Sequence, residues 1–152
     1  MSEFKELYRE CYYYMEDGQY DSFEGMDWDE IGIVSKKEIA ANDSPQGHYL
    51  LSLHYMMNGE GEKRMEELLK AANLGSCIAA IDYLEKAGYQ GVEILGIVKA
   101  MNELGHELAS LQESIDDMME GIEPGSEKMI QITEKSIEVK KNISDRNLNV
   151  YW

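Results

Sequence analysis

The sequence predicts an all-α protein built from two groups of helices. Apolar residues recur at intervals of three and four over most of the chain, which is the spacing of one face of an α-helix. The 152 residues include only two prolines, Pro45 and Pro124, and both stand where a helix can begin. We expect stacked antiparallel helical hairpins over residues 1–90. A long antiparallel helical hairpin with a short tail follows over residues 91–152, as part of one continuous compact unit.

The first group is predicted to contain five short helices. Phe4, Tyr8 and Cys11 lie on one apolar stripe of the first helix, and Ser44-Pro45 is a start signal in which an N-cap precedes proline at the first helical position. Residues 17–30 combine three aromatic side chains with six acids and show no regular pattern. Together with the glycine-containing turns, these signals predict helices at about residues 3–16, 29–41, 45–57, 62–73 and 76–87.

The second group is predicted to be a pair of long helices. From Ile94 to Ile122 the apolar residues follow a heptad seam, which favours one helix of roughly 30 residues. Pro124-Gly125-Ser126 then forms a turn and an N-cap, and a further apolar stripe predicts a last helix at about residues 127–145. Because the turn is short, we expect the two helices to be antiparallel neighbours. Residues 147–152 are expected to be a non-helical tail.

The chain is strongly acidic, with a formal net charge of −16. The acids are concentrated in two segments. Residues 1–30 contain ten acids and two bases, and residues 92–123 contain eight acids and one base. Such a chain repels nucleic-acid phosphates and anionic membrane surfaces, so direct binding to either is not expected. Solubility alone also explains acidity. A basic protein surface is the favoured partner.

The sequence favours a cytoplasmic location. Cys11 and Cys77 fall on apolar helix faces and are too few for a secreted disulfide framework. No run of about 18 apolar residues is present for a membrane span, and the first residues lack the apolar core of a signal peptide. We therefore expect a cytoplasmic protein without disulfides.

Residues 47–75 carry the pattern of a known helical repeat. The features that agree are the helix residues Tyr49, Leu51 and Tyr55, the turn Gly59-Glu60-Gly61, and the helix ending Lys70-Ala71-Ala72-Asn73-Leu74-Gly75. This stretch resembles one Sel1-like repeat, a relative of the tetratricopeptide repeat, and Ala79 begins part of a second. Gly47 and Ser52 depart from the family's alanine and glycine, and the turn is displaced by one residue. The resemblance implies a stacked scaffold that binds protein segments without catalysis.

Catalytic and metal-binding patterns are not found in the sequence. Glu103 and His106 have the Glu-x-x-His spacing of di-iron bundles, but that chemistry needs a second pair, and neither His48 nor His54 has glutamate three residues earlier. We expect the histidines to be exposed helix residues. Asp27, Asp29 and Glu30 do not follow the order of a calcium loop. We therefore expect no catalytic residue, metal or cofactor.

Two surfaces are candidates for binding another protein. Tyrosine and tryptophan surrounded by acids are typical of interface hot spots, and a line of acids on a helix attracts a basic surface. The alternatives are core packing for the aromatic residues and a solvated face for the acids. The candidate residues are Tyr13, Tyr14, Tyr20, Asp27, Trp28, Asp29, Glu113, Asp116, Asp117 and Glu120.

The sequence therefore predicts a non-catalytic protein–protein interaction module. Its size and acidity suggest an inhibitor or adaptor, of the immunity type or the phage anti-defence type, that binds a basic protein surface. A first alternative is a structural protein that forms a homodimer through the seam at residues 94–122. A second alternative is a small helical metal-binding protein or enzyme.

Overall fold

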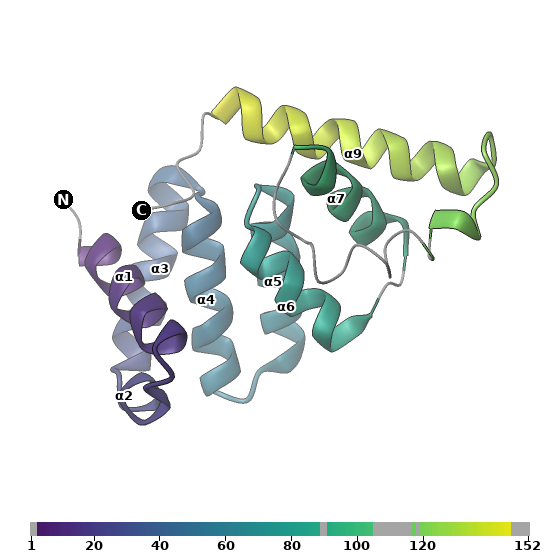
Figure 1. Cartoon of the computed structure of the whole chain (residues 1–152). Helices are drawn as coiled ribbons and strands as arrows, with labels where there is room; N and C mark the ends of the chain where they lie inside the picture. Colours follow the sequence, from purple (N-terminus) through teal and green to yellow (C-terminus); the bar gives the residue numbers. More distant parts are fainter. Residues whose placement is uncertain (1–2, 89–90, 105–116, 118, 147–152) are drawn as a thin grey trace. The chain divides into compact units, whose positions relative to one another are not determined.

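The computed structural model describes residues 3–88, 91–104, 117 and 119–146 (Figure 1). All regular secondary structure in these residues is helical, which confirms the predicted all-α class. None of the described helices is both long enough and apolar enough to cross a membrane. The helices are α1 (Glu3–Glu16), α2 (Tyr20–Glu24), α3 (Trp28–Asn42), α4 (Pro45–Met57), α5 (Gly61–Asn73), α6 (Cys77–Ala87), α7 (Val92–Glu103) and α9 (Glu127–Arg146).

The chain divides into two compact units after Ala71, whereas the sequence analysis places its boundary after residue 90. The first unit holds α1 to α4 and most of α5, and the second holds α6, α7 and α9. Apart from the end of α7, helix bounds in both units follow the predicted caps and turns. Short α2 is an addition, because it lies in the segment for which the sequence shows no regular pattern.

In the first unit, α3 and α4 form an antiparallel pair joined by Asp43 and Ser44. Asp43 caps the end of α3 in the left-handed conformation, with φ 47° and ψ 46°, and the Ser44 side chain accepts a hydrogen bond from the Gly47 N–H. At the other end of the pair, His54 Nδ1 lies 2.6 Å from the Trp28 carbonyl oxygen. The His54 ring also packs on Gly32, where an added Cβ would lie 2.6 Å from Cε1 of that ring. Glycine at position 32 thus allows the close approach of α3 and α4.

Helix α1 packs into this unit through its predicted apolar stripe. Phe4, Tyr8 and Cys11 are buried, and the Tyr8 ring meets Tyr49 of α4 edge-on at a centroid distance of 6.5 Å. Burial raises the pKa of Tyr8 to about 12, so its hydroxyl stays neutral. The opposite side of α1 is left to solvent.

In the second unit, α7 and α9 are in close contact and run in the same direction. Figure 1 shows the two ribbons following the same course. Leu95 packs with Ile132, and further along both helices Glu103 is ion-paired with Lys140. Gly96 lies at the crossing, where an added Cβ would be 3.0 Å from the Ile132 carbonyl oxygen and closer still to the Lys135 side chain.

The expected single helix of roughly 30 residues is therefore wrong, and the long antiparallel hairpin is not confirmed in the described residues. Helix α7 ends at Glu103, and the Leu104 N–H bonds back to the Ala100 carbonyl as a C-cap. Residues 119–120 are again helical, and the predicted turn at 121–126 precedes α9, with the Ser126 side chain accepting a hydrogen bond from the Met129 N–H. The first seam residues, Ile94, Ile97 and Met101, are buried within the second unit. Residues 105–116, which carry the middle of the seam, and the C-terminal tail at 147–152 lie outside the described residues.

Substituting Gly96 by alanine is expected to destabilise the second unit. The added methyl group gains about 1 kcal/mol of helix propensity but overpacks the crossing, at a cost of about 1–3 kcal/mol or more because a backbone carbonyl and Lys135 must move. We expect a net loss of about 1–2 kcal/mol in the free energy of unfolding, measured by urea denaturation with far-UV circular dichroism. Gly61→Ala is the control, since nothing lies within 4 Å of its added Cβ and α5 gains propensity. Equal stability of the two variants would contradict the close crossing.

Candidate partner-binding surface

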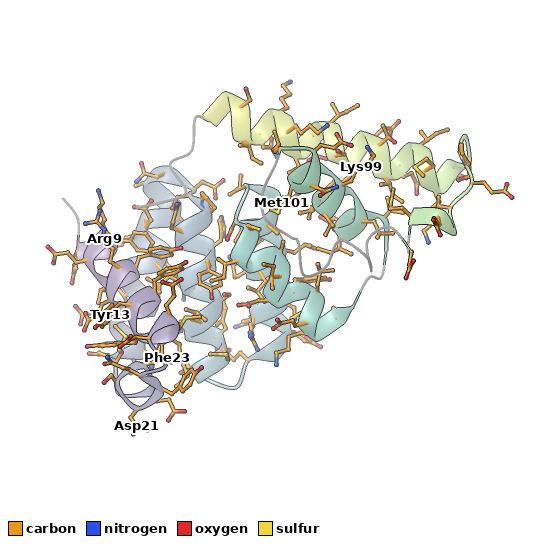
Figure 2. All side chains as sticks on the ribbon, viewed as in Figure 1. Arg9, Tyr13, Asp21, Phe23, Lys99 and Met101 are labelled. Atoms are coloured by element: carbon orange, nitrogen blue, oxygen red, sulfur yellow. The ribbon has the colours of Figure 1, made fainter. Side chains whose placement is uncertain are left out.

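The outer side of α1 and α2 presents three tyrosines to solvent. Tyr12, Tyr13 and Tyr20 are 38%, 58% and 64% exposed, although large apolar rings are usually covered. Exposed carboxylates accompany them on the same two helices and in the turn between them (Figure 2, where Tyr13 and Asp21 are labelled). We call this set the tyrosine–acid surface, and it comprises Tyr12, Tyr13, Glu16, Asp17, Tyr20 and Asp21.

Carboxylates of α1 hold the hydroxyl groups of neighbouring tyrosines. The Tyr14 hydroxyl donates a hydrogen bond to Glu10 Oε1 at 3.2 Å, and this bond raises the pKa of Tyr14. Partial burial is the main cause that raises the pKa of Tyr12, and a hydrogen bond to Glu16 raises it further. The Tyr13 and Tyr14 rings are neighbours at a centroid distance of 5.9 Å. The raised pKa values keep the Tyr12 and Tyr14 hydroxyls neutral. The exposed rings remain available for contact with another molecule.

The structure separates the N-terminal candidates into surface and core residues. Tyr13, Tyr20 and Asp29 are exposed and Tyr14 is half-buried. Trp28 is 8% exposed and meets the Phe23 ring edge-on at 4.9 Å, so its side chain belongs to the core. We therefore leave Trp28 out of the surface.

Asp27 has a structural role at the start of α3. Its Oδ1 accepts a hydrogen bond from the Glu30 N–H at 3.1 Å, which makes Asp27 the N-cap. The spacing Asp27-x-x-Glu30 is that of a capping box, a signal that the sequence analysis did not use.

The acids predicted on the long helix are only partly described. Asp117 and Glu120 are exposed, in agreement with either a solvated face or a binding face. Glu113 and Asp116 lie outside the described residues. The second candidate surface therefore consists here of two carboxylates.

His48 is the main polar residue that the sequence analysis missed. It is buried in α4, with Nδ1 2.6 Å from Glu67 Oε2 and Nε2 2.6 Å from Asp43 Oδ1. Burial by itself lowers the pKa of His48, but the two carboxylates outweigh it and raise the pKa above its ordinary value. Burial likewise raises the pKa of Glu67, and the bonds from His48 and Lys70 reverse that effect and lower it. Below this raised pKa, the ring is an imidazolium that donates to both carboxylates.

The expectation that the histidines are exposed helix residues is wrong for two of them. His48 and His54 are both buried, and His106 lies outside the described residues. Both ring nitrogens of His48 have carboxylate partners, so neither is free to remove a proton from a substrate. Glu103, the other half of the Glu-x-x-His pattern, is paired with Lys99 and Lys140. Within the described ranges, no group of three His, Cys, Asp or Glu side chains is arranged to hold a metal ion.

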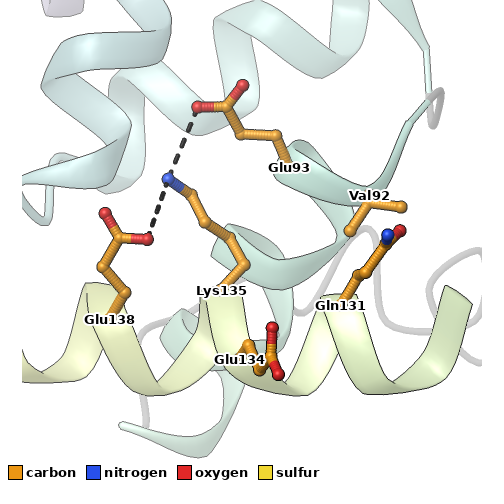
Figure 3. Close-up of a pocket in the computed structure, with 6 residues that line it drawn as sticks. All are labelled: Val92, Glu93, Gln131, Glu134, Lys135 and Glu138. Atoms are coloured by element: carbon orange, nitrogen blue, oxygen red, sulfur yellow. Dashed lines mark ion pairs between the residues drawn. The ribbon is translucent and has the colours of Figure 1, made fainter. Parts of the chain in front are cut away.

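A shallow pocket of about 370 Å³ lies between α7 and α9 in the second unit (Figure 3). Lys135 Nζ stands 3.4 Å from Glu93 Oε1 and 3.6 Å from Glu138 Oε2. Lys135 is the one base among three carboxylates in the lining, so the pocket keeps a net negative charge, and the Glu93–Lys135 pair joins α7 to α9. The lining residues are Val92, Glu93, Gln131, Glu134, Lys135 and Glu138.

Replacing His48 by glutamine is expected to destabilise the first unit in a pH-dependent way. Glutamine leaves the buried Glu67 carboxylate without its main partner, at a cost of about 3 kcal/mol. Because the pKa of His48 is raised on folding, its stabilisation is complete below the unfolded value of 6.5 and is lost as pH rises through the folded pKa. The contribution of Glu67 has the opposite sign and is lost only as pH falls through its lowered folded pKa.

Urea denaturation of wild type and H48Q, from about pH 5.5 to about pH 9.5, measures this effect. We expect the difference in the free energy of unfolding to shrink toward the alkaline end. Glu67→Gln keeps the shape of the side chain but removes its charge. In a protein that still has His48, this variant should flatten the pH dependence of the free energy of unfolding. A difference between wild type and H48Q that is constant across the range would mean that the ring is not charged.

Comparisons with protein-family models, with curated proteins and with solved structures found no match for this chain. Among the predicted site residues, the structure leaves Tyr13 of α1 and Tyr20 of α2 exposed, and exposed carboxylates lie on the same two helices.

Proposed function

We propose that this chain is a non-catalytic protein-binding module that binds a basic protein surface through the tyrosine–acid surface. The observation that carries the proposal is the exposure of Tyr12, Tyr13 and Tyr20 among carboxylates. Tyrosine offers a large contact area at a small entropic cost and is enriched in binding hot spots. The surrounding carboxylates attract a basic partner and keep the exposed rings soluble.

The chain's overall charge suits an inhibitor or adaptor. A net charge of −16 accelerates association with a basic target and repels nucleic acid, so the chain competes for surfaces that phosphates would otherwise occupy. Inhibitors of the immunity type or the phage anti-defence type meet such targets. We place the protein in the cytoplasm, where its two free cysteines, Cys11 and Cys77, remain reduced.

The resemblance to a Sel1-like repeat supports a scaffold role within this proposal. The stretch concerned corresponds to α4 and α5, joined by a turn at Asn58-Gly59-Glu60. Tyr49, Leu51, Ala71 and Ala72, which carry the resemblance, are all buried. They support the helices while leaving other faces free for a partner.

Variants of the tyrosine–acid surface test the proposal. The full chain is immobilised, proteins are captured from host extract at low and physiological salt, and the affinity of the recovered protein is measured by calorimetry. We expect Y13A/Y20A to lower this affinity at least about tenfold, the loss typical of truncating interface anchors. D17K/D21K should also lower it and should reduce its salt dependence.

E62K/E66K is the matched control, because it makes the same change in net charge on exposed positions of α5. If it weakens binding as much as D17K/D21K, net charge alone explains the association. If D117K/E120K weakens binding and the tyrosine variants do not, the interface lies on the second candidate surface. Failure to capture any stoichiometric partner at either salt concentration would remove the proposal.

A further inference from the structure

Helix α9 has a second apolar stripe on the side away from α7. Ile130 and Ile137 are 50% and 59% exposed, while Ile132, Ser136 and Val139 are buried. At 100° per residue, the two exposed isoleucines point away from the buried set, and one heptad, about 10.5 Å, separates them along the axis. We call this exposed face the outer stripe of α9, and it comprises Glu127, Ile130, Glu134, Ile137 and Lys141.

The charges on the outer stripe are complementary to a second copy of the same stripe. The midpoint between Ile130 and Ile137 along the helix falls at residues 133–134. The midpoint between Glu127 and Lys141 falls at Glu134, so the two pairs share nearly the same centre. An antiparallel pair of stripes related by a two-fold axis at this centre therefore places Ile130 opposite Ile137 and Glu127 opposite Lys141 in a single register. A parallel pair would place Glu127 against Glu127 and Lys141 against Lys141. The charges thus favour the antiparallel arrangement.

Helix α9 is also the part of the chain least opposed to self-association. Of the described helices, it alone carries more bases than acids, with five against four. The seam residues Ile94, Ile97 and Met101, through which the sequence suggests a homodimer, are already buried within the second unit. An interface between copies that used them would require this unit to open, whereas the outer stripe needs no rearrangement.

We propose that a second copy of this chain docks antiparallel on the outer stripe of α9. This self-association is independent of the tyrosine–acid surface, which lies in the other unit. One helix face buries less area than a stable dimer needs, so the dimer is weak and forms at high micromolar concentration. Two facing Glu134 carboxylates at the two-fold axis weaken it further.

Sedimentation equilibrium at physiological salt, from about 10 µM to about 1 mM protein, tests the proposal. We expect a monomer–dimer equilibrium for the wild type, about tenfold weaker dimerisation for I130S/I137S, and stronger dimerisation for Glu134→Gln. Circular dichroism is the check that each variant is folded, which we expect because these side chains are exposed. A wild-type protein that stays monomeric up to the highest concentration overturns the proposal.

A charge exchange identifies the register. Glu127→Lys and Lys141→Glu should each weaken dimerisation, and an equimolar mixture of the two should restore it, because each mixed dimer then has opposite charges at both ends. Lys128→Glu is the control for K141E, since it makes the same change in net charge at an exposed position off the outer stripe. Dimerisation that survives both single variants, or that the mixture fails to restore, means that copies do not pair through this stripe.

Discussion

In the first unit, one buried charged ring joins the end of α3 to α4 and α5. His48 donates to Asp43, which caps α3, and to Glu67 on α5. A buried charge is costly to desolvate, so this arrangement is stable only while both carboxylates stay in place. Tyr49, the next residue along α4, receives the Tyr8 ring of α1. The position of α1, and of the tyrosines on its outer side, therefore follows from how α4 is held.

Local signals were sufficient to predict most helices. Ser44, Ser76 and Ser126 act as N-caps because their side chains accept bonds from nearby N–H groups, an arrangement set within four residues. The end of α7 was not predicted. The heptad pattern from Ile94 to Ile122 indicates which face would be buried in a helix, but not that the helix continues past Leu104. The next residue in the sequence is a glycine, a common residue just past a helix end, and the heptad pattern takes no account of it.

The candidate site was predictable in composition but not in exposure. Residues 17–30 hold three aromatics, and nothing local distinguishes Tyr20, which faces solvent, from Trp28, which packs on Phe23. That difference arises from the packing of α2 and α3, which is tertiary. His48 and Glu67 were missed for a related reason, because they are 19 residues apart and meet only when α4 and α5 pack. Burial of a paired charge leaves no periodic signal in a sequence.

The two proposed surfaces respond to salt in opposite ways. A basic partner is attracted by the whole acidic chain, so raising the salt concentration weakens its binding. Two copies of a chain with net charge −16 repel each other over long distances, while the Glu127–Lys141 contacts act at short range. The Debye length falls from about 30 Å at 0.01 M salt to about 8 Å at 0.15 M, which screens the repulsion more than the contacts. Dimerisation should therefore strengthen between these concentrations, which sedimentation equilibrium at the two salt concentrations measures.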